Sequence, residues 1–563
     1  MRWTIKPIPD PEKVALLSKK LGVEKTIAHL LLQRGIETYE DAEKFFAPEL
    51  SHLHDPFLMK DMDRAVKRII KAIETGENIL VYGDYDVDGT TSVAMMTEYL
   101  LEFTPNVATY IPDRYTEGYG VSYAGIQFAD DNDISLIIAL DCGIKAVDKV
   151  AHAKELGIDF IICDHHLPGE IIPEAVAVLD PKRADCPYPF KELCGCGVGF
   201  KLIQALNRTF DLDDNKLIPF LDLVATAIGA DIVPIIGENR VLAHFGLRVI
   251  NSSPRVGFRA ILESVKKKKL TVNDVVFIIA PRINAAGRMK HGNHAVALLR
   301  EKNLTKAKIL ANEIETYNRE RREADKQITE EALMQIRENQ EEVRHTTVVY
   351  HESWHKGVLG IVASRLTETY YRPTLVFTRS DEYLSASARS VMGFNIYQAL
   401  EDCAEHIVQF GGHQYAAGLT ILKKNFQAFK DAFEKTVSET IDKRLLSPEV
   451  EIDMEIDFED ITPKFYRIIK RFAPFGPGNK MPVFLTKNII DTGAGRCVGE
   501  DGKHLRLVMK QKDSSTLTGI GFGLGEKEDI SCNGKPFKAV YCLDENEWQG
   551  QVMLQLRIKD IKP

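Results

Sequence analysis

Residues 78–91 read NILVYGDYDVDGTT, and this stretch decides the fold of the first half of the chain. Its first apolar residues follow one another without alternation, which is typical of a short central strand in a parallel sheet covered on both faces. The strand runs directly into three acids at alternate positions, Asp84, Asp86 and Asp88. Ligands bind beyond the carboxyl ends of such strands, so the stretch predicts an α/β fold with a site at that edge.

Three more apolar runs of the same kind follow, with amphipathic segments between them: residues 134–140, 158–163 and 175–179. Strands that alternate with helices predict a doubly wound parallel sheet. We assign residues 61–260 to this α/β domain. The preceding residues, 1–60, contain short helical patterns and are assigned to an N-terminal helical segment.

A long helix is predicted over residues 304–340, where apolar residues recur at helical spacing and neither Pro nor Gly occurs. We interpret it as a spacer between two lobes, within a connecting region of residues 261–345. A hairpin of two shorter helices with an unrecognised turn is the alternative. A second α/β unit is expected over residues 346–445, because it opens with the strand-like TTVVYHES.

The last stretch, residues 446–563, is rich in strand patterns. Leu505, Leu507 and Met509 alternate with positions that include two basic residues. Such short alternating strands predict a small barrel, and an OB-type barrel is one option among several. The aromatic residues that could stack on nucleobases, although most are expected in the core, are Phe475, Phe484, Phe522 and Trp548.

The composition fits an ordinary globular protein, with 44% hydrophobic and 27% charged residues and a net charge of −9 over 563 residues. This length predicts about three or four domains. The chain has no run of about 18 apolar residues, so we expect no membrane span. Its first residues, MRWTIKPIPDPEKVA, lack the apolar stretch of a signal peptide, and we expect a cytoplasmic protein. Net acidity argues against a general nucleic-acid coat protein but not against a nuclease.

The nine cysteines are an odd and sparse set, which fits reduced thiols better than a disulfide framework. Three of them, Cys186, Cys194 and Cys196, cluster in a Gly-rich stretch. A zinc site usually needs a second close pair of Cys or His, which this cluster lacks. Zinc is therefore the weaker interpretation.

Acids and imidazoles also follow the other predicted strands. Asp141 closes residues 134–140, Asp164-His165-His166 follows residues 158–163, and Asp231 follows a helical run. Adjacent carboxylates repel one another unless a cation neutralises them. Carboxylates with one or two imidazoles suit Mn²⁺ or Mg²⁺. Two such ions can activate a water and stabilise the oxygens of an in-line phosphoryl displacement.

An EF-hand loop and a helix N-cap both fit the first acid cluster less well than a metal site of this kind. An EF-hand loop beginning at Asp84 would need a bidentate Glu at its twelfth position, which is Met95. A helix N-cap accounts for one acid but not for three at alternate positions. The cluster therefore predicts metal binding.

Four segments in this order resemble the motifs of the DHH phosphoesterase superfamily: Asp84-Tyr-Asp-Val-Asp-Gly89, Leu140-Asp-Cys-Gly143, Asp164-His-His166 and Ala230-Asp-Ile-Val-Pro234. Further segments narrow the resemblance to its single-strand-specific 5′→3′ DNA exonucleases: Ile111–Arg114, Glu117–Gly120, Pro281–Arg288, His355–Gly360 and Phe410–Gly418. The resemblance implies a DHH catalytic domain over 61–260 and a DHHA1-type substrate-binding domain over 346–445. It also implies an OB-like nucleic-acid-binding domain over 446–563.

The resemblance implies two Mn²⁺ or Mg²⁺ ions in one active site. The implied metal ligands are Asp84, Asp86, Asp88, Asp141, His165 and Asp231. The implied catalytic residues are Asp141, which bridges the ions, Asp164, His165 and His166. In this set His166 faces the scissile phosphate and Asp164 orients the imidazoles. Tyr82 stands where several branches carry a His, and Asp84 is expected to compensate.

The implied substrate-binding residues are Arg114, Arg282, Ser387 and Arg389, which grip a terminal 5′ phosphate, and the loop Gly411, Gly412 and His413. Guanidinium groups bind a phosphate dianion bidentately, and two glycines allow close approach of the backbone to an oxyanion. A surface ion pair is the alternative for each Arg, and Arg288 could equally cap a helix. The basic stretches 266–269 and 319–322 are either a solvated face or part of a groove for single-stranded DNA.

By resemblance, the activity is the release of 5′ mononucleotides from single-stranded DNA in DNA repair and recombination. The implied partners are a RecQ-type helicase and a single-strand-binding protein. One alternative is a phosphodiesterase of cyclic dinucleotides or short oligonucleotides, which the long helix and the β-rich domain oppose. The second alternative is a non-catalytic relative that binds DNA as a scaffold, which the retained acids and His oppose. Without an oligomer-forming coiled coil, a monomer is expected.

Overall fold

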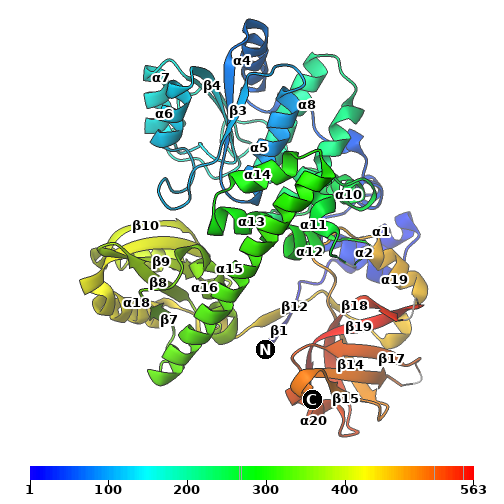
Figure 1. Ribbon diagram of the computed structural model, residues 1–563. Helices are drawn as coiled ribbons and strands as arrows, with labels where there is room; N and C mark the ends of the chain where they lie inside the picture. Colours follow the sequence, from blue (N-terminus) through cyan, green and yellow to red (C-terminus); the bar gives the residue numbers. More distant parts are fainter. Residues whose placement is uncertain (266, 268, 513, 549–550) are drawn as a thin grey trace.

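The computed structural model describes residues 1–265, 267, 269–512, 514–548 and 551–563. Two α/β units and a β-barrel make up most of the chain, and the long helix α15 runs from the first unit to the second (Figure 1). The predicted fold class, with its parallel sheet, second α/β unit and small barrel, is confirmed. None of the described helices is both long and apolar enough to cross a membrane.

The first sheet is parallel throughout, with strand order β3-β2-β4-β5-β6. Its strands are β2 (Asn78–Gly83), β3 (Val107–Tyr110), β4 (Ile134–Leu140), β5 (Asp159–Cys163) and β6 (Ala177–Leu179). Separate apolar clusters cover its two faces, as the runs without alternation predict. The covering helices are α4 (Met62–Thr75), α5 (Val87–Leu100) and α8 (Gly195–Thr209) on one face, and α6 (Tyr123–Asp131) and α7 (Val147–Glu155) on the other.

A helical region leads from this unit to the second. It contains α9 (Leu221–Ala230), α10 (Gly237–Ser252), α11 (Val256–Leu262), α12 (Val272–Asp274), the π-helix η4 (Val275–Ile279), α13 (Ala280–Met289), α14 (Asn293–Arg300) and α15 (Leu304–Glu338). The helix α15 is continuous over 35 residues, so the alternative of a two-helix hairpin is wrong. The side chain of Asn303 caps its start by accepting a hydrogen bond from the backbone of Lys306. At 1.5 Å per residue it is about 50 Å long.

The second α/β unit has a mixed sheet of strand order β10-β11-β9-β8-β7. Its elements are β7 (Thr347–Tyr350), α16 (Leu359–Tyr370), β8 (Thr374–Ser380), β9 (Tyr383–Arg389), α17 (Ile396–Glu401), β10 (Ile407–His413), β11 (Ala416–Leu422) and α18 (Phe426–Thr440). The C-terminal half of α15 packs against this unit through Ile328, Ala332 and Ile336. One helix thus belongs to the cores of both α/β units.

The C-terminal strands close into a barrel in the order β14-β16-β17-β19-β18-β14. With a short helix between β17 and β18, the third and fourth of these strands along the chain, this is the topology of an OB-fold. The elements are β12 (Glu449–Ile452), β13 (Met454–Glu455), α19 (Pro463–Lys470), β14 (Phe484–Asp491), β15 (Arg496–Val498), β16 (His504–Lys510), β17 (Leu517–Gly521), α20 (Glu528–Ser531), β18 (Phe537–Trp548) and β19 (Gln551–Lys562).

The N-terminal residues pack on this barrel. The strand β1 (Arg2–Ile5) pairs in parallel with β12. The helices are α1 (Pro11–Leu21), α2 (Lys25–Leu32) and α3 (Tyr39–Phe46). Ile27 and Leu30 share one apolar cluster with Phe465 and Phe484 of the C-terminal region. The two ends of the chain therefore share a single core.

Candidate metal centre and phosphate pocket

Strands β2, β4 and β5 deliver acids and imidazoles to one edge of the first sheet, and helix α9 ends beside them. The Nε2 atom of His165 lies 3.2 Å from Oδ1 of Asp141, 3.6 Å from Oδ2 of Asp231 and 3.8 Å from Oδ2 of Asp88. Ligand atoms within 4.8 Å of one another form two overlapping groups, Asp88–His165–Asp231 and Asp141–His165–His166. The predicted gathering of these side chains is thus present.

The donor set fits a divalent cation. Neither Nε2 of His165 nor Oδ1 of Asp141 has a hydrogen-bond partner among the described residues, although both are buried. Buried polar atoms are almost always satisfied, so these orphaned atoms have the character of ligands to a cation. Oxygen atoms with one imidazole nitrogen are ligands suited to Mn²⁺ or Mg²⁺.

The electrostatics agree with this interpretation. Burial, followed by the charges of neighbouring acids, raises the pKa of Asp88 to about 7 and that of Asp231 to about 8. Burial also lowers the pKa of His165 to about 3, so its imidazole is neutral and free to act as a ligand. Carboxyl groups that resist ionisation side by side become carboxylates when a cation binds between them.

The remaining acids of the first motif have other contacts. Asp86 caps α5 by accepting a hydrogen bond from the backbone N–H of Gly89 at 3.0 Å. Asp84 is fully buried, with Oδ1 accepting from the N–H of Gly120 at 3.3 Å and Oδ2 without a partner among the described residues. Neither acid belongs to the two groups around His165. Tyr82 donates its hydroxyl to the carbonyl of Gly120 at 2.9 Å, so it holds that loop instead of facing the acids.

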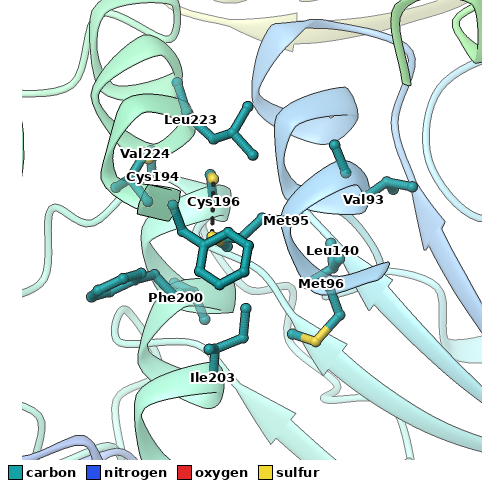
Figure 2. Packing of buried hydrophobic residues seen from close by; sticks show 14 of the residues in the cluster. Val93, Met95, Met96, Leu140, Cys194, Cys196, Phe200, Ile203, Leu223 and Val224 are labelled. Atoms are coloured by element: carbon teal, nitrogen blue, oxygen red, sulfur yellow. Dashed lines mark hydrogen bonds between the residues drawn. The ribbon is translucent and has the colours of Figure 1, made fainter. Parts of the chain in front are cut away.

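The cysteine cluster has a structural role. Cys194 caps α8 by accepting from the backbone N–H of Gly197. Cys196 lies on α8 and packs against α5. Its sulfur is 4.0 Å from that of Met95, among apolar side chains (Figure 2). The backbone N–H groups of Gly195 and Cys196 both donate to Asp88, at 2.7 and 2.6 Å. The Gly-rich stretch at the start of α8 therefore holds the carboxylate of Asp88 in place.

His166 is held differently from its neighbour. Its Nδ1 lies 2.7 Å from Oδ1 of Asp164. Burial would lower the pKa of His166, but the hydrogen bond and charge of Asp164 raise it to about 9. The hydroxyl of Tyr119 lies 3.0 Å from the other ring nitrogen, Nε2. Tyr119 was not among the predicted site residues. Its position between two glycines, Gly118 and Gly120, is the feature of the sequence that could have indicated it.

Arginines from both α/β units meet beside this centre. Arg114 lies with its guanidinium 4.8 Å above the ring of Tyr85, and Arg288 donates to the carbonyl of Gly357 at 3.1 Å. Burial and the charges of Arg114 and Arg389 lower the pKa of Arg288. Within the described residues none of these three arginines forms an ion pair. Uncompensated guanidinium groups that crowd one another are typical of a site for a phosphate.

Ser387 lies at the same pocket. A Cβ on Gly360 would lie 2.7 Å from Nη2 of Arg389 and 3.6 Å from Oγ of Ser387, so both side chains face that glycine. Arg282 has a partner of its own, because its Nε pairs with Glu315 of α15 at 2.7 Å. The structure thus brings Arg288 to the pocket and ties Arg282 to the long helix.

The Gly411-Gly-His413 segment ends β10, and all three residues are exposed. Burial and the charges of Lys145, His166 and Lys182 lower the pKa of His413, so the hairpin reaches the metal edge. Lys145 and Lys182 were missed by the sequence interpretation, although both follow strand ends. Of the basic stretches, Lys266 and Lys268 lie outside the described residues, Lys267 pairs with Asp274, and Arg322 pairs with Glu315.

Three family models match the chain in order: the DHH family, N-terminal domain, over residues 78–228, the DHHA1 domain over 343–439 and the RecJ OB domain over 452–560. The single-stranded-DNA-specific exonuclease RecJ of Bacillus subtilis is 37% identical over 564 residues, which is all of this chain and 70% of that protein. The protein of the same name from Salmonella typhimurium is 34% identical, with 95% of this chain and 96% of that protein covered.

A crystal structure of RecJ in complex with Mn²⁺ from Thermus thermophilus is also similar. It matches with a TM-score of 0.86 and 26% sequence identity, over 100% of this chain and 79% of that chain. The DHH, DHHA1 and OB units that the resemblance implied are therefore confirmed. With relatives above 30% identity matched over most of their length, this chain belongs to the RecJ family of DHH proteins.

Proposed function

We propose that this chain is a metal-dependent exonuclease that degrades single-stranded DNA from its 5′ end and releases 5′ mononucleotides. The observation that carries the proposal is the meeting of the orphaned ligand atoms around His165 with the arginine pocket of Arg114, Arg288 and Arg389. A metal centre alone fits many phosphoesterases, whereas a cationic pocket beside it recognises a strand end. The relatives named above are single-strand-specific exonucleases, which supports the same activity here.

The residues that would hold Mn²⁺ or Mg²⁺, as two ions, are Asp84, Asp86, Asp88, Asp141, His165 and Asp231. Such ions supply a water nucleophile and neutralise charge on the phosphoryl oxygens when bound. Asp164 keeps the imidazole of His166 protonated. The Nε2–H group of His166 then donates a hydrogen bond to a nonbridging oxygen of the scissile phosphate. That oxygen takes the place of the Tyr119 hydroxyl at Nε2.

End recognition follows from the arginine pocket. Arg114, Ser387 and Arg389 bind the terminal phosphate dianion, and the buried charge of Arg288 adds to the attraction. Gly411 and Gly412 bring backbone N–H groups to the DNA strand. Position 412 must be a glycine, because a Cβ there would lie 2.4 Å from the carbonyl oxygen of Ala416. The strand thus runs between the two α/β units.

The barrel extends the DNA path. Arg496, Arg506 and Arg557 lie in one row across β15, β16 and β19, with Ile520 of β17 between the last two. Like charges opposite one another destabilise a sheet, and none of the three forms an ion pair within the described residues. The exposed ring of Phe522 lies beside this row, 5.9 Å from the guanidinium of Arg557. Arginines with an exposed aromatic ring suit a single strand.

The other aromatic candidates of the C-terminal domain fit base stacking less well. Phe484 is buried in the barrel core and Phe475 packs against it. The side chain of Trp548 lies outside the described residues.

The test uses a single-stranded oligonucleotide labelled at its 3′ end, with and without a 5′ phosphate, in Mn²⁺, Mg²⁺ or EDTA. We expect labelled products that shorten from the 5′ end, faster with the 5′ phosphate and absent in EDTA. Cleavage of cyclic dinucleotides without cleavage of the long strand would instead place the chain among small-substrate phosphodiesterases.

The cellular setting is inferred from family membership. We infer a role in DNA repair and recombination in the cytoplasm, where a RecQ-type helicase and a single-strand-binding protein would present the single strand. The proposed domain limits are 61–260 for catalysis, 346–445 for substrate binding and 446–563 for the nucleic-acid path, and a monomer is proposed. Size-exclusion chromatography with light scattering tests the oligomeric state.

A further inference from the structure

The order of strands in the first sheet places cations at both ends of the acidic edge. The order is β3-β2-β4-β5-β6, and Arg114 follows β3 at one end. The acids follow β2, β4 and β5 in the middle, and Lys182 follows β6 at the other end. Neighbouring strands are about 4.8 Å apart, so the two ends are separated by about 19 Å. The metal centre therefore lies between two groups of positive charge, one at each end of this edge.

The second group joins two lysines and one imidazole, from three elements. Lys145 lies in the loop after β4, Lys182 in the loop after β6, and His413 at the tip of β10. Lys145 is exposed, with its stem near Gly169 of the loop that follows His166. Lys182 is half-buried, in a turn that Asp180 fixes by accepting from the backbone N–H of Lys182 at 2.7 Å. Neither lysine has an ion-pair partner among the described residues.

We propose that Lys145, Lys182 and His413 form the subsite for the first backbone phosphate on the 3′ side of the scissile bond. The strand then crosses the sheet edge from β3 to β6, with its 5′ phosphate at Arg114 and its continuing 3′ part between the lysines and the β10 hairpin. This inference rests on the proposed nuclease function and adds the direction of the strand to it.

The chemistry of the surroundings supports a nucleotide at this place. The acidic edge repels a polyanion, so a strand that crosses it needs cations on both sides. The terminal phosphate binds in the arginine pocket and the scissile phosphate at the metal centre. The lysine group is therefore left for the first linkage beyond the scissile one. Leu167 and Ile171, in the loop beside Lys145, are exposed apolar side chains that would contact the sugar or base of that nucleotide.

A simpler role for Lys182 is to offset the negative charge of the metal centre, since its charge acts to lower the pKa of Asp231. In that case its removal would weaken cleavage of every substrate alike. A phosphate subsite instead affects only substrates that carry the phosphate in question. The two roles are separated by substrate length.

The experiment compares a 5′-phosphorylated dinucleotide, which has one linkage, with the trinucleotide, which has two. A third substrate is the trinucleotide with a neutral methylphosphonate as its second linkage. The variants are Lys145→Ala combined with Lys182→Ala, and Lys145→Gln alone, whose exposed position avoids a folding defect. The control is Lys149→Ala, which removes the same charge from the nearby helix α7.

In wild type and in the control variant, we expect the neutral second linkage to raise KM by about tenfold, as for loss of one charged hydrogen bond. In the double variant, KM for the trinucleotide should rise about tenfold more than KM for the dinucleotide. The neutral linkage should then cost nothing further, because its partner is already gone. Lys145→Gln should show the same pattern with a smaller rise.

The subsite is refuted if KM of the double variant rises equally for the dinucleotide and the trinucleotide. It is also refuted if the neutral linkage still raises KM of the double variant as much as it does in wild type. If the wild-type chain cleaves none of these substrates, the nuclease function itself fails. The same three oligonucleotides are then compared by equilibrium binding in EDTA. Loss of the difference between the charged and neutral second linkages in the double variant would still support the subsite, and its persistence would refute it.

Discussion

Nε2 of His165 lies 3.2 Å from Oδ1 of Asp141, and neither atom has a hydrogen-bond partner among the described residues. The two side chains extend from the ends of β5 and β4, which pair through Cys163 and Leu140. The parallel backbone therefore holds an imidazole nitrogen beside a carboxylate oxygen without a bond between them. A divalent cation is the partner that both atoms can share.

Replacing Asp141 tests this relationship. We expect Asp141→Asn to lower kcat/KM on single-stranded DNA by more than about 100-fold, because several kcal/mol of charge stabilisation depend on the ions. The variant should also lose most of the rise in melting temperature that Mn²⁺ gives the wild-type chain, since a ligand stabilises only the state that binds it. Asp148→Asn, an exposed acid on α7, is the control. Full activity of Asp141→Asn would refute the metal assignment.

The pH dependence tests the role of His166. Its pKa of about 9 keeps the imidazole protonated at neutral pH, so we expect activity to fall as the pH rises through about 9. In Asp164→Asn burial is opposed only by the charges of Asp231 and Asp88, so the falling limb should move to lower pH. The measurement is kcat/KM between about pH 5.5 and 10 at saturating metal. An unchanged limb in Asp164→Asn would show that another group titrates.

The same pair contributes to stability with a defined sign. Since the pKa of His166 is raised in the folded chain, the stabilisation by Asp164 is fully present below about pH 6.5 and is lost as the pH rises through about 9. Chemical denaturation in EDTA at about pH 6 and about pH 10 measures it. The difference in unfolding free energy between these two pH values should be smaller in Asp164→Asn than in the wild-type chain.

The arginine pocket is tested by substitution at Gly360. A Cβ there would lie 2.7 Å from Nη2 of Arg389, a flexible end that can move, so Gly360→Ala should fold normally. We expect it, and Arg389→Ala more strongly, to reduce the preference for a 5′ phosphate over a 5′ hydroxyl by about tenfold or more. Arg282→Ala is the informative comparison, because Arg282 pairs with Glu315. An equal loss of preference in Arg282→Ala would place that residue in the pocket as well.

The barrel surface is tested with substrates of two lengths. Phe522→Ala should weaken binding of a strand of about 30 nucleotides by about tenfold, as for loss of one stacked base, and leave a tetranucleotide unaffected. Ile490→Ala removes another exposed apolar side chain of the barrel, from β14, and serves as the control. Fluorescence anisotropy in EDTA gives both affinities. If Phe522→Ala binds the long strand as tightly as Ile490→Ala does, the DNA path avoids this face.

Local pattern was enough to predict the frame of the site. Apolar runs without alternation predicted parallel strands, and parallel strands have their carboxyl ends at one edge. Asp88, Asp141 and His165 each follow such a run directly or by a few residues. Their convergence therefore follows from chain order, and it was predictable without knowledge of any contact.

The partners of long side chains were not predictable in this way. Arg282 and Arg288 belong to one segment, yet Arg282 pairs with Glu315 of α15 and Arg288 lies among arginines of both α/β units. Tyr82 stands where several branches of the family carry a His, and its hydroxyl holds the loop at Gly120. Such outcomes depend on residues that are distant in sequence, whose distances are set only when the units pack.

By itself, the sequence determined the order of the units, the parallel sheet and the acidic edge, because these depend on periodicity and on the residues directly after each strand. Only the tertiary structure decided which cations reach that edge and that the N-terminal helices share the core of the barrel. Long-range packing brings together residues such as Lys182 and His413, more than two hundred positions apart. No local pattern encodes that meeting, because it depends on how the second α/β unit docks against the first.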